Sequence, residues 1–318
     1  MFELSKEQRN AAKVRSMMVL LAIGMILDAL FGEPKWLWSR ISHPVVVIGK
    51  LITLADQRLN KPPAQKAKGT VFLFTLVAIS GLLGAILNQL GPIIQTLLIA
   101  ILIAQKSLVD HVGAVATGLR RSLAEGKTAV SLIVGRDFTE MDEAQVTRAA
   151  IESAAENFSD GVIAPIFWYL VAGLPGLIIY KAVNTADSMI GYKTEKYIYF
   201  GWAAARFDDL LNFIPARLSA VLLCWSTGNF LLRGWCNIVS DARLHRSPNA
   251  GWPEAAMAKA LQIALAGPRS YGGTVQEFAW VNEGANKHAS AHDIENAVRT
   301  LWSAWALWLL IVLILSLI

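Results

Sequence analysis

The fold of this chain is decided by GTVFLFTLVAISGLLGAILN, residues 69–88. The stretch carries no charged residue, and as an α-helix it would be about 30 Å long. The hydrocarbon core of a bilayer has the same thickness. Residues 69–88 therefore predict a helix that crosses a membrane.

Further apolar stretches place the rest of the chain in the same class. The chain is 54% hydrophobic and 17% charged, whereas soluble domains are roughly 25% charged. We therefore expect an all-α fold, a polytopic helical integral membrane protein with about four to five membrane segments and helical cytoplasmic loops. Residues 1–318 would form a single membrane-embedded domain, with 105–160 and 184–300 as its mainly cytoplasmic, motif-bearing regions. The other candidate membrane segments are Met17–Phe31, Pro92–Ala104, Val162–Val183, Ile214–Trp235 and Leu301–Ile318.

Short links and prolines predict how these segments are connected. Pro92–Ala104 follows residues 69–88 almost at once, which predicts a tight helical hairpin. Val162–Val183 contains Pro165 and Pro175, so it either crosses the membrane or re-enters and returns to the same side. We favour the re-entrant form, because a full crossing would separate the polar stretches on its two sides.

The distribution of Lys and Arg predicts the orientation. These residues gather in alternate loops, and loops of this kind remain in the cytoplasm. We therefore expect a multi-pass protein of the inner (cytoplasmic) membrane whose polar motifs face the cytoplasm.

Charge, cysteine and histidine usage argue against several other classes. The net charge of +5 comes with no basic run or aromatic stacking array, so nucleic acid is not an expected partner. The two cysteines, Cys224 and Cys236, are too few for a disulfide framework. His245, His288 and His292 lack the spacing of a zinc site. The basic loops are instead expected to face an anionic lipid bilayer.

A first polar cluster lies in IESAAENFSDGVIAP, residues 151–165. A helix is predicted over Met141–Asn157, with Thr139 as its N-cap. Glu152 and Glu156 lie one turn apart on it, and Asp160 would share their face if the helix continued. Three carboxylates on one face repel one another unless a cation or a cationic ligand lies among them. The alternative is a solvated acidic face.

Two further clusters follow in NTADS and RFDDLLN, residues 184–188 and 206–212. In the first, Asn184, Asp187 and Ser188 lie on one side of a helix. In the second, Asp208 and Asn212 share a face and Asp209 points elsewhere. Oxygen ligands of this kind bind Mg²⁺ that also carries substrate phosphates. The structural alternative is that Asp208 caps a helix or pairs with Arg206 or Arg217.

Three loops could contact a ligand. They are SHPVVVIGK (residues 42–50), SPNAGWPEAA (247–256) and AGPRSYGG (266–273). Pro253 stands where a helix could begin, and the free N–H groups of a helix start can bind an anion. Arg269 would suit a phosphate or a carboxylate. His43 could contact a ligand, donate a proton or simply start a helix, and ordinary turns would explain all three loops equally well.

Seven motifs in this order resemble the CobD/CbiB family of integral membrane proteins. They are HPVVVIGK (43–50), VGRD (134–137), IESAAENFSDGVIAPIFW (151–168), YKAVNTADSMIGYKTEKY (180–197), FGWAAARFDDLLNFIPAR (200–217), SPNAGWPEAAMA (247–258) and GPRSYGG (267–273). The resemblance extends from about Leu27 to Asp293, and no motif is missing.

The resemblance implies a function in cobalamin biosynthesis. A member of this family is expected to join aminopropanol or aminopropanol phosphate to the remaining free carboxyl of adenosylcobyric acid, with ATP as co-substrate. The product would be adenosylcobinamide or its phosphate. The implied partners are these corrinoid and aminopropanol substrates, the lipid bilayer and other membrane enzymes of cobalamin assembly.

Chemistry, rather than the resemblance, suggests a role for each candidate residue. An unactivated carboxylate does not condense with an amine, so ATP must activate it, and Mg²⁺ would neutralise the phosphates. We expect Asp187 and Asp208 to bind Mg²⁺. Glu152 or Glu156 would be the base that deprotonates the amine, with Asp160 as a third catalytic candidate. Substrate and ATP binding are assigned to His43, Asn157, Asn184, Tyr192, Arg206, Asp209, Asn212, Arg217, Asn249, Glu254 and Arg269.

Two other function classes compete with this reading. An intramembrane Mg²⁺-dependent prenyltransferase also uses Asp and Asn clusters, but its acidic motifs should repeat with similar spacing, and these clusters differ. A transporter or membrane sensor would favour an internal inverted repeat, and the sequence has none. Protection by cobyric acid with ATP, and not by prenyl diphosphates, would distinguish the classes.

Overall fold

The computed structural model describes residues 6–135, 138, 140–228, 232–271 and 274–317, and helices dominate them. Within these residues, five helical segments are long and apolar enough to cross a membrane. They are Ala11–Phe31, Gln65–Asn88, Pro92–Arg121, Glu143–Ile190 and Ala291–Leu317. The prediction of an all-α polytopic membrane protein is confirmed.

The chain divides into two compact units. Unit 1 comprises Met1–Ala104, Ala164–Asn212 and Leu309–Ile318, and unit 2 comprises Gln105–Ile163 and Phe213–Trp308. Each unit is built from segments far apart in the sequence, and each is described by itself below.

Unit 1 is built around α4 and α9, which pack against each other. Its helices are α1 (Lys6–Phe31), α2 (Lys35–Trp38), α3 (Pro44–Leu59), α4 (Gln65–Asn88), α5 (Pro92–Leu102), α9 (Ala164–Ile190) and α10 (Trp202–Leu211). The predicted hairpin joins α4 to α5. Gly91 takes a φ of 94° there, and Pro92 starts α5 in the position where its missing N–H costs nothing.

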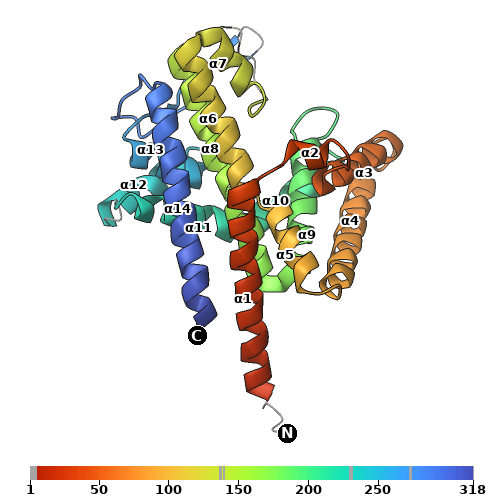
Figure 1. The fold of residues 1–318 in the computed structure, drawn as a ribbon. Coiled ribbons are helices and arrows are strands. Elements are labelled where there is room, and N and C mark those ends of the chain that lie inside the picture. Colours follow the sequence, from red (N-terminus) through yellow and green to blue (C-terminus); the bar gives the residue numbers. More distant parts are fainter. Residues whose placement is uncertain (1–5, 136–137, 139, 229–231, 272–273, 318) are drawn as a thin grey trace. The chain divides into compact units, whose positions relative to one another are not determined.

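Helix α9 reverses direction within its own length (Figure 1). Ala172 and Gly173 leave helical geometry, Gly173 with φ 64° and ψ −155°. A Cβ atom placed on Gly176 would lie only 2.4 Å from the carbonyl oxygen of Trp168. In a straight helix, residues eight positions apart would be about 12 Å apart. The chain therefore folds back near Gly173, within the predicted segment Val162–Val183.

Close backbone contacts hold this reversal against α4. A Cβ on Gly84 of α4 would lie 2.5 Å from Cα of Pro175, and a Cβ on Gly69 would lie 2.0 Å from the carbonyl oxygen of Phe200. In the apolar core between α4 and α9, Tyr180 is fully buried. The second half of α9 is thereby fixed, and with it the residues of the NTADS motif at its end.

In unit 2, small residues lie where helices α8 and α13 pack against each other. Its elements are α6 (Gln105–Arg121), α7 (Leu123–Val130), α8 (Glu143–Phe158), the π-helical turn η1 (Ser159–Ile163), α11 (Phe213–Ser226), α12 (Leu232–Ala242), α13 (Gly251–Leu261) and most of α14 (Ala291–Leu317). Helices α8 and α13 pack together, and both bury alanines, such as Ala150 and Ala154 of α8 and Ala255 and Ala256 of α13. Small side chains let helix backbones approach closely.

Two predicted elements need correction. Ile214–Trp235 is not one membrane segment, because α11 ends at Ser226 and a turn with Gly228 at φ 72° follows. At 14 residues, α11 is too short to span a bilayer, and it packs instead against α13 and η1. The predicted helix over Met141–Asn157 exists but starts at Glu143, where Asp142 and Gln145 form a reciprocal capping box. Thr139, the predicted cap, lies outside the described residues, as do Arg136 and Asp137 of the VGRD motif.

Short strands interrupt the region expected to be helical. Strand β1 (Leu265–Ala266) pairs antiparallel with β4 (Trp280–Val281), and β2 (Arg269–Tyr271) pairs with β3 (Thr274–Gln276). The AGPRSYGG loop therefore begins in one strand pair and continues into the other. Gly272 and Gly273 lie outside the described residues.

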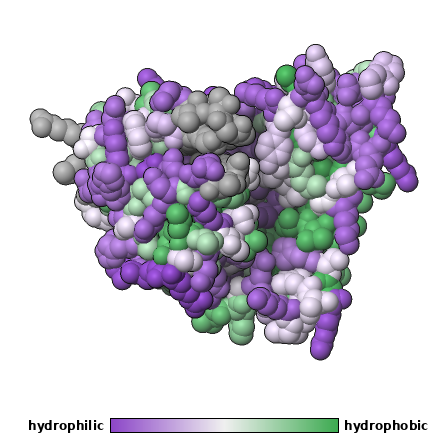
Figure 2. All heavy atoms as spheres, turned by 90° about the horizontal axis from the view of Figure 1, so that it is seen from above, coloured by the Kyte–Doolittle hydropathy of each residue, from purple (hydrophilic) through white to green (hydrophobic). Residues whose placement is uncertain are grey.

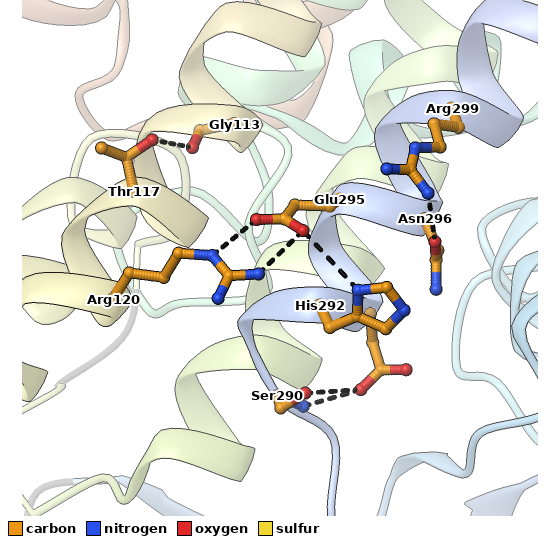
Figure 3. Close-up of polar contacts among 9 residues, drawn as sticks. Gly113, Thr117, Arg120, Ser290, His292, Glu295, Asn296 and Arg299 are labelled. Carbon is orange, nitrogen blue, oxygen red and sulfur yellow. Dashed lines mark hydrogen bonds and ion pairs between the residues drawn. The ribbon is translucent and has the colours of Figure 1, made fainter.

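Polar contacts fix the start of α14, the last candidate membrane span. Arg120 of α6 donates two hydrogen bonds to the Glu295 carboxylate, at 2.7 and 2.9 Å (Figure 3). In the first turn of α14, the Asp293 carboxylate accepts the N–H of Ser290 at 2.8 Å. On the face shown in Figure 2, hydrophilic side chains likewise cover most of the surface, with smaller hydrophobic areas between them. The chain thus combines apolar helices with polar helix ends.

Replacing Gly173 with alanine should destabilise the protein by about 1–3 kcal/mol, because its φ and ψ lie in a region that is essentially open to glycine alone. Gly113→Ala is the matched control, since a Cβ at this α6 position meets no atom within 4 Å. The control should be neutral or stabilise by about 0.5–1 kcal/mol. Thermal unfolding in detergent measures both, and equal stability of the two variants would contradict the reversal at Gly173.

Candidate functional site

The first polar centre lies in unit 1, where the ends of α9 and α10 meet. We call it the Asp208 centre and define it by Tyr180, Asn184, Asp187, Asp208 and Asn212. Asn184 and Asn212 donate to the two carboxylate oxygens of Asp208, at 3.3 and 2.9 Å. The Tyr180 hydroxyl donates to the side-chain oxygen of Asn212, at 2.9 Å. The hydrogen bond from Asn212 to Asp208 confirms the prediction that these two residues share one face of the helix.

The Asp208 carboxylate is in an unfavourable environment for its charge. Asp208 is 8% exposed. Burial, and secondarily the neighbouring Asp187 carboxylate, raise the pKa of Asp208 to about 7, although the two amides partly oppose the shift. A divalent cation between the two carboxylates would remove this repulsion.

Asp187 is held close to the end of its helix. A Cβ on Gly191 would lie 1.9 Å from Oδ1 of Asp187, and the Gly191 N–H bonds the Asp187 carbonyl at 2.7 Å. Glycine at position 191 therefore leaves the space that the Asp187 carboxylate occupies. Within the described residues there is no group of three or more His, Cys, Asp or Glu that could hold a metal by itself. A cation here would need amide oxygens, water or substrate phosphates as its other ligands.

Other predicted residues of unit 1 lie apart from this pair. Asp209 pairs with Arg206 at 3.4 Å, on the partly exposed side of α10, so Arg206 is not the partner of Asp208. Tyr192 is 59% exposed in the turn after α9. Nothing in the described contacts assigns these three residues to a ligand.

His43 starts a helix, as one of the sequence alternatives held. Its Nδ1 accepts the Val45 N–H at 3.2 Å, so Nε2 carries the proton and donates to the Ile101 carbonyl at 3.2 Å. Burial lowers the pKa of His43, which favours the neutral ring. The two ring nitrogens thus serve the N-terminus of α3 and the end of α5.

The second polar centre lies in unit 2 and is built around a guanidinium group. We call it the Arg217 centre and define it by Phe213, Arg217, His245, Asn249, Trp252 and Glu254. The guanidinium carbon of Arg217 lies 3.7 Å from the centroid of the Phe213 ring and 4.6 Å from that of Trp252. Arg217 also donates to the Asn249 side-chain oxygen at 3.3 Å. Partial burial lowers the pKa of Arg217 because it makes the charged form more costly, and an anionic ligand would compensate that charge.

The SPNAGWPEAA loop supports this centre through contacts that the sequence did not reveal. The Ser247 N–H bonds Nδ1 of His245 at 3.0 Å, and the Ser247 hydroxyl accepts the N–H groups of Asn249 and Ala250. Nε2 of His245 lies 3.6 Å from the buried Glu254 carboxylate. His245 thus links the loop to α13, a role that a search for metal-ligand spacing does not detect. Tyr180 was also missed, although its position one turn before Asn184 is visible in the sequence.

Glu152, predicted as a base, is buried and holds the backbone of a loop. Its Oε1 accepts the Ala266 N–H at 2.8 Å, where Ala266 takes a φ of 60° at the base of AGPRSYGG. A Cβ on Gly267 would lie 2.5 Å from the Trp280 ring, which closes the same bend. Glu152 therefore positions the loop, while the side chain of Arg269 in that loop lies outside the described part of the structure.

The three predicted carboxylates of this stretch do not share one environment. Glu152 is buried, Glu156 and Asn157 are exposed, and Asp160 is half-buried. Asp160 follows Ser159 in the π-helical turn η1, whose wider winding shifts the face expected from α-helical spacing. Asn157 bonds back to Ser153 at 2.8 Å on its own helix.

Together, the fold and these two centres define a polytopic helical membrane protein with a buried acidic centre in one unit and a partly buried basic centre in the other. Residues 21–301 match the family model described as CobD/Cbib protein. The chain therefore belongs to this family and has a role in cobalamin biosynthesis.

Curated relatives agree with this assignment over nearly their full length. A Rhizobium meliloti (strain 1021) protein named "Cobalamin biosynthesis protein CobD" is 49% identical over 306 residues, 90% of this chain and 93% of the relative. Proteins with the same name from Brucella suis and Rhodobacter capsulatus are 46% and 44% identical. They cover 95% and 83% of this chain, and 97% and 86% of their own lengths. No solved structure matches the chain.

The raised pKa of Asp208 predicts a specific pH dependence of stability. A folded-state pKa near 7, above the unfolded value of 3.8, means that the native state binds the proton more tightly. Stability should therefore fall as the pH rises from about 4 to about 7, by an amount on the order of a few kcal/mol. Asp208→Asn should abolish this fall. Thermal unfolding of the wild-type and Asp208→Asn proteins across this pH range measures the fall in stability. Parallel stability–pH profiles for the two proteins would contradict a raised pKa of Asp208.

Substitutions at Glu152 should separate its hydrogen bond from its charge. Glu152→Ala leaves the Ala266 N–H without an acceptor and should destabilise the protein by about 1–3 kcal/mol. Glu152→Gln keeps an acceptor oxygen in place and should be nearly neutral. Chemical denaturation measures both, with the exposed Glu156→Ala as the control. Equal losses for the Ala and Gln variants at position 152 would show that the charge itself stabilises the fold.

Proposed function

We propose that this protein forms an amide bond between aminopropanol, free or phosphorylated, and the remaining free carboxyl of adenosylcobyric acid, at the expense of ATP. The product is adenosylcobinamide or its phosphate. The observation that supports this most is the Asp208 centre, where a buried carboxylate faces a second carboxylate among amides. Such a pair suits the cation that accompanies ATP.

The reaction divides into two transfers. The carboxylate oxygen of the corrinoid attacks the γ-phosphorus of ATP, the bond from that phosphorus to the bridging oxygen breaks, and ADP leaves. The amine nitrogen then attacks the acyl phosphate carbon, phosphate leaves, and the nitrogen gives up its proton. The first transfer requires that phosphate charge is neutralised, and the second requires that the amine is unprotonated.

Asp187 and Asp208 would hold Mg²⁺, because the ion would offset both carboxylate charges, and the Asp187 charge adds to the effect of burial in raising the pKa of Asp208. When bound, Mg²⁺ would neutralise part of the negative charge of the nucleotide phosphates. Asn184 and Asn212 orient the two oxygens of Asp208 through their amide groups. The fully buried Tyr180 fixes Asn212 in turn.

The Arg217 centre would bind an anionic group of a substrate. A guanidinium group that stacks on aromatic rings keeps its donors in one plane, which suits two oxygens of a phosphate or a carboxylate. Phe213 and Trp252 provide the stacking surfaces, and Asn249 fixes the orientation through its hydrogen bond to Arg217. The same aromatic surfaces suit the apolar faces of a corrinoid.

The exposed Glu156 is the stronger of the two candidates for the base. Glu152 is buried, and its Oε1 already accepts the Ala266 N–H. A base must reach the ammonium group of a substrate, and Glu156 lies at the surface of α8. In this proposal Glu152 positions the AGPRSYGG loop and Glu156 takes the proton.

We further propose that the protein resides in the inner membrane with both centres accessible from the cytoplasm, where ATP is available. The reversal of α9 supports a shared side for the motifs before and after it, because a re-entrant segment returns the NTADS motif to the side on which α9 begins. Labelling of Thr194→Cys by an impermeant reagent from the periplasmic side would refute it.

Asp187→Asn and Asp208→Asn should each abolish cobalamin synthesis from cobyric acid, by orders of magnitude in rate, because the cation site loses a charge. Cells carrying either variant should still grow when cobinamide is supplied. The matched control is Asp110→Asn, an exposed α6 residue paired with Lys106, which should support full synthesis. Both variants should insert and fold in detergent.

Ligand protection of the purified protein tests the reaction class directly. Cobyric acid with ATP and Mg²⁺ should raise its melting temperature, and prenyl diphosphates should not. Formation of cobinamide from these substrates, measured by chromatography, is the decisive readout. Full complementation by both aspartate variants, or protection by prenyl diphosphates alone, would overturn the proposal.

A further inference from the structure

Helix α3 (Pro44–Leu59) has three different faces. Ile48, Ile52 and Ala55 form the face that packs into unit 1, where Ile52 is fully buried. Residues spaced three or four positions apart lie on one side of a helix. By this spacing, Val47, Leu51 and Leu54 form a second stripe, which is apolar yet exposed. Lys50, Thr53 and Gln57 form a third stripe, which is polar and exposed and is preceded on the same side by the exposed Val46.

This helix is not one of the candidate membrane spans. Its 16 residues are about 24 Å long, shorter than the hydrocarbon core, and include Lys50, Asp56 and Arg58. A helix in water would not leave three large apolar side chains exposed in one row, and a spanning helix would not carry an exposed polar row beside them. An exposed surface divided in this way is typical of a helix that lies in the plane of a membrane interface.

The surroundings of α3 continue into a lipid-facing surface. Within unit 1, α3 packs against α4 and α9. Helix α4 is a candidate span whose exposed side chains include Phe74, Leu82 and Ile86. Lys61, Lys66 and Lys68 follow α3 and surround the start of α4, and basic side chains there are attracted to anionic headgroups.

A hydrogen-bonded network ties α3 to the chain that follows the NTADS motif. Asp56 accepts Nζ of Lys196 at 2.7 Å and the side-chain amide of Asn60 at 2.8 Å. Asn60 also donates to the Lys196 carbonyl at 3.0 Å. Burial of Asp56 acts to raise its pKa, but the hydrogen bonds from Lys196, Asn60 and Tyr197 together outweigh it and lower the pKa. The position of α3 therefore fixes that of the loop after α9.

We infer that α3 is an in-plane interfacial helix that docks on the anionic headgroup layer of the bilayer. Val47, Leu51 and Leu54 enter the upper acyl region, and Lys50, Thr53 and Gln57 face water. Arg58 shares the side of the apolar stripe, and its long stem lets the charge reach the headgroups. Because α3 holds the loop after Asp187, the Asp208 centre lies near headgroup depth rather than at the middle of the bilayer.

Single cysteines labelled with an environment-sensitive fluorophore test this placement. The full-length protein carries Cys236→Ser, and the buried Cys224 stays in place. Leu51→Cys and Leu54→Cys report on the apolar stripe, Thr53→Cys and Gln57→Cys on the polar stripe, and Leu82→Cys on α4. Each is reconstituted in vesicles of phosphatidylcholine and phosphatidylglycerol that contain a nitroxide either near the headgroup or near the end of the acyl chain.

The stripes should respond differently. Probes at 51 and 54 should emit at shorter wavelength than those at 53 and 57, and the headgroup-proximal nitroxide should quench them more than the deep one. Probes at 53 and 57 should instead be quenched by aqueous iodide. The probe at 82, on a spanning helix, should respond to the deep nitroxide at least as strongly as the others.

Three results would overturn the inference. Iodide quenching at 51 and 54 without nitroxide quenching would place α3 in water. Stronger quenching there by the deep nitroxide would make α3 part of a span. A blue-shifted emission without quenching by either agent would show that protein, such as a second copy of this chain, covers the stripe.

Substitution of the exposed basic residues of α3 provides a second test of the inference. Lys50→Glu with Arg58→Glu should reduce nitroxide quenching at position 54 in vesicles that contain phosphatidylglycerol, and much less in pure phosphatidylcholine. An equal reduction in both lipids would show that the headgroup charge plays no part. This outcome does not depend on the amide ligation, so it fails or succeeds independently of the proposed function.

Discussion

The reversal of α9 at Gly173 is the constraint on which the rest of unit 1 depends. A chain in hydrocarbon must satisfy its backbone hydrogen bonds within its own helices, so a break in α9 is tolerated only where protein surrounds it. Here α4 provides that protein, through Gly84 against Pro175. The second half of α9 then returns to α10, and the contact between these two helices forms the Asp208 centre.

The two polar centres carry opposite charges, but each holds its charged group in the same kind of environment. In each, burial makes a charged group more costly, and neighbouring side chains orient it without neutralising it. For Asp208 the neighbours are amides, and for Arg217 they are aromatic rings and an amide oxygen. A bound partner of opposite charge gains more from such a group than from one in water, because screening is weaker in the protein.

The sequence predicted the features that depend on local pattern. Hydrophobic length located the five candidate spans, although it also predicted Ile214–Trp235, which the turn at Gly228 divides. The prolines and glycines of residues 162–183 indicated that the helix there is interrupted. Helical spacing placed Asp208 and Asn212 on one face. Spacing failed where the winding changed, at the π-helical turn before Asp160, and where a contact joins distant segments, as between Glu152 and Ala266. The strand pairs around AGPRSYGG escaped prediction because each strand has only two or three residues.

The repulsion between Asp187 and Asp208 also bears on how readily proteases can cleave the protein. Proteases act on molecules that open locally, and the opening free energy is lower where like charges are held together. A ligand that binds the native state shifts that equilibrium in proportion to the logarithm of its concentration. A cation bound between Asp187 and Asp208 would therefore protect the end of α9 from proteolysis.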